Sequence, residues 1–237
     1  MVVRDLFSGV GNAISNFCSK ISDVCERIGG SIGSFAEKVF SPVLFPNITL
    51  LEAAVKVIGA VVGAIADLFG IKEVDETPEE IGMKAEEAAN QGIKPDNFDS
   101  YEEYITYLRD NIEIDKNKAE NLSDEEKLKY TAIGASVLVK GIEEKEKIEI
   151  PAEFIAEIGK QKLEAEEVRE YIKSFKEMGI PLSSFTGYLK GTLNANDYEK
   201  VGNAIECGIR NLNPELSIEQ VDDKIDDMSK KSRGENR

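Results

Sequence analysis

The sequence contains no histidine and no tryptophan among its 237 residues. Without histidine, the chain lacks the commonest general acid–base group and the commonest metal ligand of proteins. Catalysis by a Ser-His-Asp triad or a Cys-His pair is therefore excluded. Any enzymatic chemistry would have to use carboxylates, lysine or tyrosine, and we expect no cofactor and no metal site.

Cysteine is scarce as well, since the chain has only Cys18, Cys25 and Cys207. An odd count with irregular spacing is not a disulfide framework. On one helix, Cys18 and Cys25 would be separated by about 10 Å of rise, too far for a bridge. Three thiols in a reducing compartment are the expected state, and a bridge between two copies through Cys18 or Cys25 is the alternative.

Two further absences bear on location and partners. The first residues lack a basic segment followed by an uninterrupted apolar run, so we expect no secretory signal peptide there. We expect a cytoplasmic protein, or one exported by a route that needs no signal peptide. The formal net charge is −16, which argues against a nucleic-acid partner.

The charge is unevenly distributed along the chain. Residues 1–71 carry five basic and six acidic groups, so almost all of the net charge lies after residue 71. Gly70 to Pro78 reads as a linker or sharp turn. The sequence therefore predicts an apolar amphipathic helical region over 1–71 and an acidic all-helical domain over 78–237.

Apolar residues in the first region repeat with a helical period. They form two rows with a spacing of seven residues, namely Val3, Val10, Phe17, Val24 and Phe7, Ile14, Ile21, Ile28, Phe35. This is the spacing of a coiled-coil seam, but the flanking residues are Ser, Gly and Asn rather than charged ones. A core helix pair, an interfacial membrane helix or a partner-binding helix fits better, over about residues 3–40 with a break at Gly29-Gly30.

The most hydrophobic stretch is a second predicted helix over residues 48–71. Its only charges, Glu52, Lys56 and Asp67, project within about 60° of one another at 100° per residue. The uncharged run from Val57 to Ala66 is shorter than the ~20 residues of a typical transmembrane helix. A buried central helix, a membrane-inserting helix and an assembly interface are the three interpretations, and Gly59-x-x-x-Gly63 would allow close helix packing in any of them.

The acidic part is divided into helices by recognisable start signals. Capping boxes begin at Thr77, Ser100, Ser123 and Ser217, each with Glu or Gln three residues later. We predict helices near residues 78–90, 100–117, 124–145, 152–161, 165–178, 183–190, 197–211 and 218–230. The expected fold is all-α, a multi-helix bundle or array.

No motif in the chain marks a catalytic site. Acidic clusters such as Glu143/Glu144/Glu146 and Asp222/Asp223/Asp226/Asp227 could in principle hold the paired carboxylates of a hydrolase. Solvated helix faces with ion pairs four residues apart explain these clusters more simply.

The leading hypothesis is a non-enzymatic interaction or assembly protein, whose apolar N-terminal region binds a partner or self-associates. A membrane-active protein that inserts 48–71, such as a pore-forming toxin or delivered effector, is the alternative, and a carboxylate-dependent hydrolase is the third. Phage and secretion-system proteins offer only an analogy. The expected interaction or insertion surface comprises Phe17, Ile21, Val57, Ile58, Gly59, Val61, Val62, Gly63, Ile65, Leu68 and Phe69.

Overall fold

Side-chain caps set where several helices begin. Thr77 Oγ1 accepts a hydrogen bond from the Glu80 amide at 3.1 Å, and the Glu80 carboxylate accepts one from the Thr77 amide at 2.9 Å. The same reciprocal pair forms at Ser123 and Ser217. Each box satisfies amides that the first turn of a helix cannot pair internally, so three of the four predicted starts are complete capping boxes. Ser100 caps its helix without the return bond from Glu103, which instead accepts from Asp99.

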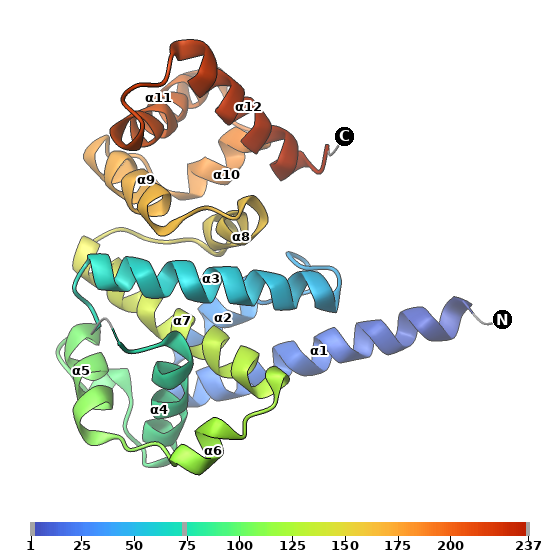
Figure 1. Ribbon diagram of the computed structural model, residues 1–237, viewed down its shortest axis with the longest axis vertical. Coiled ribbons are helices and arrows are strands. Elements are labelled where there is room, and N and C mark those ends of the chain that lie inside the picture. The colour runs from blue at the N-terminus through green and yellow to red at the C-terminus, as the bar shows by residue number, and fades with distance from the viewer. Residues whose placement is uncertain (1–2, 73–74, 236–237) are drawn as a thin grey trace. The chain divides into compact units, whose positions relative to one another are not determined.

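The computed structural model describes residues 3–72 and 75–235, and the side chains of these residues except 3–13, 30, 116 and 118. All regular structure in this described part is helical, which confirms the expected all-α fold (Figure 1). The elements are α1 (Val3–Ile28), α2 (Gly30–Val39), α3 (Ile48–Leu68), α4 (Pro78–Asn90), η1 (Pro95–Asn97), α5 (Tyr101–Asn111), α6 (Lys116–Glu120), α7 (Asp124–Glu146), α8 (Ala152–Gln161), α9 (Ala165–Glu177), α10 (Ser183–Leu189), α11 (Ala195–Leu212) and α12 (Ile218–Arg233).

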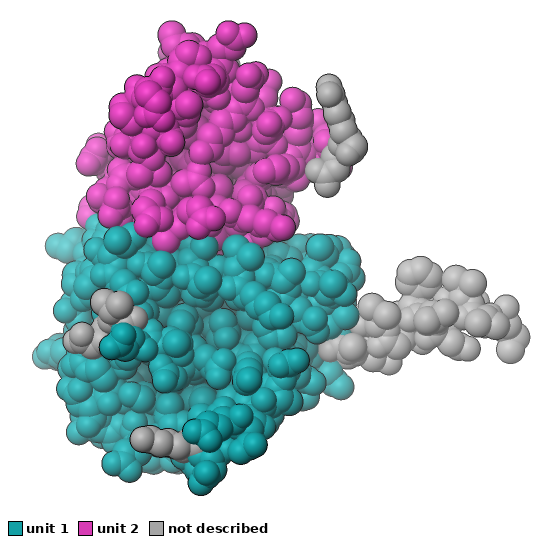
Figure 2. Space-filling view, viewed as in Figure 1, with its two compact units in different colours: residues 1–147 teal, residues 148–237 magenta. Residues whose placement is uncertain are grey.

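The chain divides into two compact units, residues 1–147 and 148–237 (Figure 2). This division differs from the expected one at residues 72–78. The reason is that α4 and α7, which lie in the acidic part of the sequence, pack directly on α1 and α3 of the apolar part. The change in charge at residue 72 marks a change in surface composition and not a boundary between cores.

The central helix of the first unit is α7. It contacts α1, α2, α3, α4 and α5, and it is buried on most of its circumference (Figure 1). Its middle, from Tyr130 to Val139, carries no charge, whereas both of its ends are strongly charged. A helix surrounded by others needs apolar residues on all sides, which is why α7 has almost no amphipathic pattern. The central position, which was one of three interpretations for residues 48–71, is occupied by α7.

Glycines allow α4 and α7 to approach at backbone distance. A Cβ at Gly134 would lie 1.7 Å from the carbonyl oxygen of Pro78, and one at Gly82 would lie 2.1 Å from that of Tyr130. Only a residue without a side chain fits at either position. The crossing of α4 over α7 therefore depends on both glycines.

The expected close packing at Gly59 and Gly63 is also present. A Cβ at Gly59 would lie 2.2 Å from Cγ2 of Thr131 on α7, and one at Gly63 would lie 3.0 Å from Cγ of Pro78. These two glycines face the first unit's own helices, so they fix α3 within its core. At the N-terminal side, Gly29 separates α1 from α2, which folds back onto α1.

The expected seam along the first helix packs inside the first unit. Its described members, Ile14, Phe17, Ile21, Val24, Ile28 and Phe35, are all buried. Val3, Phe7 and Val10 lie outside the residues whose side chains the structure describes. The helix expected over 100–117 is divided, because α5 ends at Asn111 and α6 begins at Lys116.

The second unit is held by aromatic packing and one buried carboxylate. Phe185 contacts Phe154, Tyr171 and Phe175 with ring centroids 5.1 to 5.9 Å apart. Glu157 on α8 is fully buried and accepts hydrogen bonds from Ser232 Oγ at 3.0 Å and from Gln161 Nε2 at 3.2 Å. Because Ser232 belongs to α12, this carboxylate fastens the last helix to the first helix of the unit.

We predict that Gly134→Ala lowers the free energy of unfolding of the first unit by at least about 3 kcal/mol, because the new methyl group overlaps the Pro78 carbonyl. Chemical denaturation followed by circular dichroism measures the change. Gly29→Ala is the control, since a Cβ there meets only Pro95 at 3.8 Å, and we expect a change within about 0.5 kcal/mol. Equal stability of the Gly134→Ala variant and the wild type would contradict the crossing.

Candidate functional site

The structure places most of the expected interaction surface in the core of the first unit. Phe17, Ile21, Ile58, Gly59, Val61, Val62, Gly63 and Ile65 are buried, Val57 and Phe69 are partly exposed, and Leu68 is 42% exposed. The physical reason is that one side of α3 packs along α7, with further contacts to α1 and α4. Only the other side of α3 is available to a partner.

That other side, called here the outer face of α3, is apolar or small along its whole length. It comprises Leu50, Ala53, Val57, Ala60, Ala64 and Leu68. Leu50 is 50% exposed and Leu68 is 42% exposed, and Val43, in the turn before α3, is 89% exposed. Three exposed aliphatic side chains on or next to one helix are typical of a binding surface rather than of a solvated one.

Charge is confined to one edge of this outer face. At about 100° per residue, Lys56 and Asp67 project in nearly the same direction, beside the line of Ala53, Ala60 and Ala64. Lys56 is exposed, and Asp67 forms an ion pair with the buried Lys72 at 2.5 Å. The outer face therefore has an apolar edge and a charged edge.

A second candidate site is the polar groove where α1, α4 and α7 meet. Glu86 is at its centre, with Arg27 Nη2 at 2.9 Å and Lys129 Nζ at 3.3 Å. Burial alone would raise the pKa of Glu86. Hydrogen bonds from Tyr130, Lys129 and Arg27, together with the charge of Lys129, outweigh burial and hold that pKa below its usual value.

A cavity beside Glu86 has room for a small ligand, and Glu86 itself is held in its charged form. This cavity of about 400 Å³ lies between α4, residues 113–115 and α7, and it is lined by Glu86, Glu87, Glu113, Asp115, Glu126 and Lys129, among others. A general acid at neutral pH needs a carboxyl with a raised pKa, and Glu86 is shifted in the opposite direction. The geometry at Glu86 is that of an ion-pair network joining three helices.

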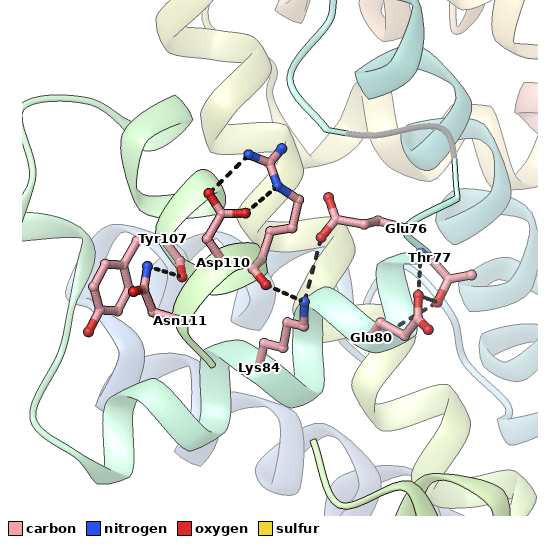
Figure 3. Close-up of polar contacts among 8 residues, drawn as sticks. Glu76, Thr77, Glu80, Lys84, Tyr107, Asp110 and Asn111 are labelled. Atoms are coloured by element: carbon pink, nitrogen blue, oxygen red, sulfur yellow. Dashed lines mark hydrogen bonds and ion pairs between the residues drawn. The ribbon is translucent and has the colours of Figure 1, made fainter. Parts of the chain in front are cut away.

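A third polar cluster fastens α5 to α4 (Figure 3). Lys84 Nζ donates to the carbonyl oxygen of Arg109 at 3.2 Å and lies 3.7 Å from the Glu76 carboxylate. The Arg109 side chain turns to its neighbour Asp110, and its hydrogen bond lowers the pKa of that carboxyl. Lys84 thus neutralises the carbonyl end of α5, which is a structural role.

The cysteines differ in accessibility. Cys25 is fully buried, and burial, with a smaller contribution from the nearby Glu86, raises the pKa of its thiol to about 12. Burial also raises the pKa of Cys18, which is partly exposed, as is Cys207. A bridge between copies through Cys25 therefore requires unfolding, whereas Cys18 is partly accessible.

Two features of these sites were not predicted from the sequence. The Glu86 network joins residues that are far apart in the chain and follow no motif. Leu50, Ala53, Ala60 and Ala64 were not assigned to an interaction surface, although the charges at Lys56 and Asp67 already marked the solvent side of that helix. Among the described residues, no group of three or more Cys, Asp or Glu side chains could hold a metal ion.

Comparisons with protein-family models, curated proteins and solved structures gave no match to this chain. Function is therefore inferred from the arrangement of the residues themselves.

We predict that Glu86→Gln destabilises the first unit by about 1–3 kcal/mol at pH 7, because it removes a carboxylate that accepts charged hydrogen bonds. Since the folded pKa of Glu86 is lowered, its contribution is present above the usual value of 4.5 and is lost as the pH falls through the folded value. The difference from wild type should shrink below about pH 4.5 in denaturation measurements. Glu125→Gln, in a mostly exposed pair with Lys20, is the control and should change stability by less than about 1 kcal/mol.

We also predict that a thiol reagent modifies Cys18 and Cys207 in the folded protein at pH 8 and does not modify Cys25. The reason is that Cys25 is both buried and protonated. All three thiols should react after denaturation, and Cys25→Ala should leave the native count unchanged. Rapid reaction of three thiols in the folded protein would show that the α1–α4 packing around Cys25 is open.

Proposed function

We propose that this protein is a non-enzymatic helical interaction protein that binds a protein surface through the outer face of α3. The observation that carries the proposal is the exposure of Leu50 and Leu68 on a helix whose opposite face is fixed in the core. Fully burying one leucine side chain contributes about 1.5–3 kcal/mol, so covering this face favours association. Binding in this way requires no rearrangement of the first unit.

The outer face of α3 contrasts with the solvent side of the other long helices. On α12, for example, Glu219, Asp222, Asp223 and Asp226 are exposed beside one large apolar residue, Ile218, and its mean hydropathy is correspondingly low. Exposed charges of this kind keep the solvent side of a helix hydrated and disfavour its burial against another protein. On α3 only one edge carries such exposed charges, which supports a role in recognition for the rest of its outer face.

Membrane insertion is the second candidate, and one observation favours it. Among the described residues, α3 is the one helix that is long and apolar enough to cross a bilayer. Insertion, however, would separate α3 from α7 and break the close contacts at Gly59 and Gly63. It would also expose the apolar middle of α7, so a pore-forming or delivered protein would have to unfold much of its first unit. Docking through the existing outer face needs neither change.

The remaining properties fit an interaction protein of a reducing compartment. The cysteines in the described part of the chain are free thiols, which supports the cytoplasm as the proposed location. The net charge of −16 makes a nucleic acid or an anionic lipid surface an unfavourable partner. A carboxylate-dependent hydrolase would need a general acid that stays protonated near neutral pH. The lowered pKa of Glu86 does not suit that residue to the role.

Photo-crosslinking tests the proposal. A benzophenone amino acid replaces Leu68 in the full-length protein, and cells that produce the protein are irradiated. We expect discrete adducts of defined mass from this position, because its side chain lies at the proposed contact. Met178 is the matched control, since it is 44% exposed and lies on the second unit, and it should give no such adduct.

Two outcomes would count against the proposal. Absence of adducts at Leu68, or the same adducts at both positions, would show that the outer face of α3 binds no protein. Flotation with phosphatidylcholine vesicles, lost in a Leu50→Lys/Leu68→Lys variant that remains folded, would favour the membrane-active alternative.

A further inference from the structure

Two of the three charged residues of α3, Lys56 and Asp67, are arranged in a self-complementary way, and the third, Glu52, lies one turn before Lys56. Lys56 and Asp67 lie on the same edge of the helix, three turns apart, with about 16 Å of rise between them. One is positive and near the N-terminal half, and the other is negative and near the C-terminal end. A helix with this arrangement matches its own inverted copy.

We propose that the outer face of α3 pairs with the same face of a second copy of this chain, with the two helices antiparallel. This inference rests on the proposed function and names the partner. A closed contact between identical chains is two-fold symmetric and places the same surface of each copy against the other. For two antiparallel helices related in this way, the same edge of each helix meets at the contact.

The register of this pair follows from the charges. If each Lys56 faces Asp67 of the second copy, the two-fold axis passes between Val61 and Val62. Ala60 then lies near its own equivalent, and Ala64 lies close by. Alanines at the crossing point allow the two helices to approach closely.

The apolar edge closes the same contact. In this register Leu68 of one copy lies within about 3 Å, along the helix axis, of Val57 of the other, and both residues lie on the edge opposite Lys56 and Asp67. Leu68 is 42% exposed and Val57 is partly exposed in the single chain, so pairing would cover both. One edge of the pair is therefore apolar and the other carries two symmetric ion pairs, while Asp67 keeps its buried partner Lys72.

The size of the contact sets the expected affinity. One helix pair buries less than the about 1,200–2,000 Å² of a standard stable interface. We therefore expect a dimer that dissociates at concentrations on the order of 10 μM rather than a permanent one. Sedimentation of the full chain from below to well above that concentration should show a shift from monomer to dimer.

A charge reversal tests the ion pairs. Lys56→Glu places a carboxylate opposite Asp67 of the second copy at both symmetric positions, so the dissociation constant should rise at least about tenfold. Lys200→Glu changes the net charge equally at an exposed position on α11, and it should leave the dissociation constant within about twofold. Equal effects of the two substitutions would overturn the proposed register.

Cross-linking tests the orientation. In a Cys18→Ser/Cys207→Ser background, Ala60→Cys should give a covalent dimer with a short bis-maleimide linker. Ala53→Cys should not, because the two copies of residue 53 lie about 25 Å apart in the antiparallel register. Both positions react in a parallel pair, so cross-linking at residue 53 would overturn the proposal.

The mass of the adducts formed at position 68 separates this inference from the proposed function. Adducts of twice the chain mass, with concentration-dependent sedimentation, support self-pairing. Adducts with a different protein only, from a chain that sediments as a monomer throughout, overturn self-pairing and leave the proposed function standing. No adduct at all overturns both.

Discussion

The contact on which the first unit depends is the backbone crossing of α4 and α7 at Gly82 and Gly134. At both glycines a Cβ would overlap a carbonyl group of the other helix, so the two backbones touch directly. At this short distance many backbone atoms of the two helices are in van der Waals contact, and the sum of their dispersion attraction stabilises the crossing. It also makes α4 the most extensive neighbour among the five helices that surround α7. The crossing is therefore sensitive to substitution, since no residue other than glycine fits at these two positions.

The position of α3 follows from that crossing. Pro78 begins α4, and its carbonyl meets Gly134 while its ring meets Gly63 of α3. A single residue therefore joins the three helices at one point, and Thr131 fills the space left at Gly59. With one side held by these contacts, α3 can neither rotate nor shift without disturbing the α4–α7 crossing. Its outer face is consequently presented in a fixed orientation, which favours recognition of a surface of definite shape.

Local signals in the sequence were sufficient to predict most helices but not their arrangement. Capping boxes at Thr77, Ser123 and Ser217 act within a few residues, so the sequence shows them directly. The burial of α7 depends on five other helices, and charge composition does not report such packing, so the two compact units divide after residue 147 and not at residues 72–78. The uncharged run from Tyr130 to Val139 was a sequence signal for the burial of α7, of the same kind as the run from Val57 to Ala66 in α3.

The exposed surface of α3 was also predicted only in part from the sequence, for a different reason. Hydropathy identified α3 as the unusual helix, but it weights both sides of the helix equally. The expected surface therefore included core residues such as Ile58 and Ile65 and omitted Leu50 and Ala53. Charges provide the missing direction, because an unpaired charge is costly to bury and marks the solvent side. Glu52, Lys56 and Asp67 thus mark the side of α3 whose apolar residues stay exposed, and in a helix so hydrophobic these three charges say more about the exposed surface than the many apolar residues around them.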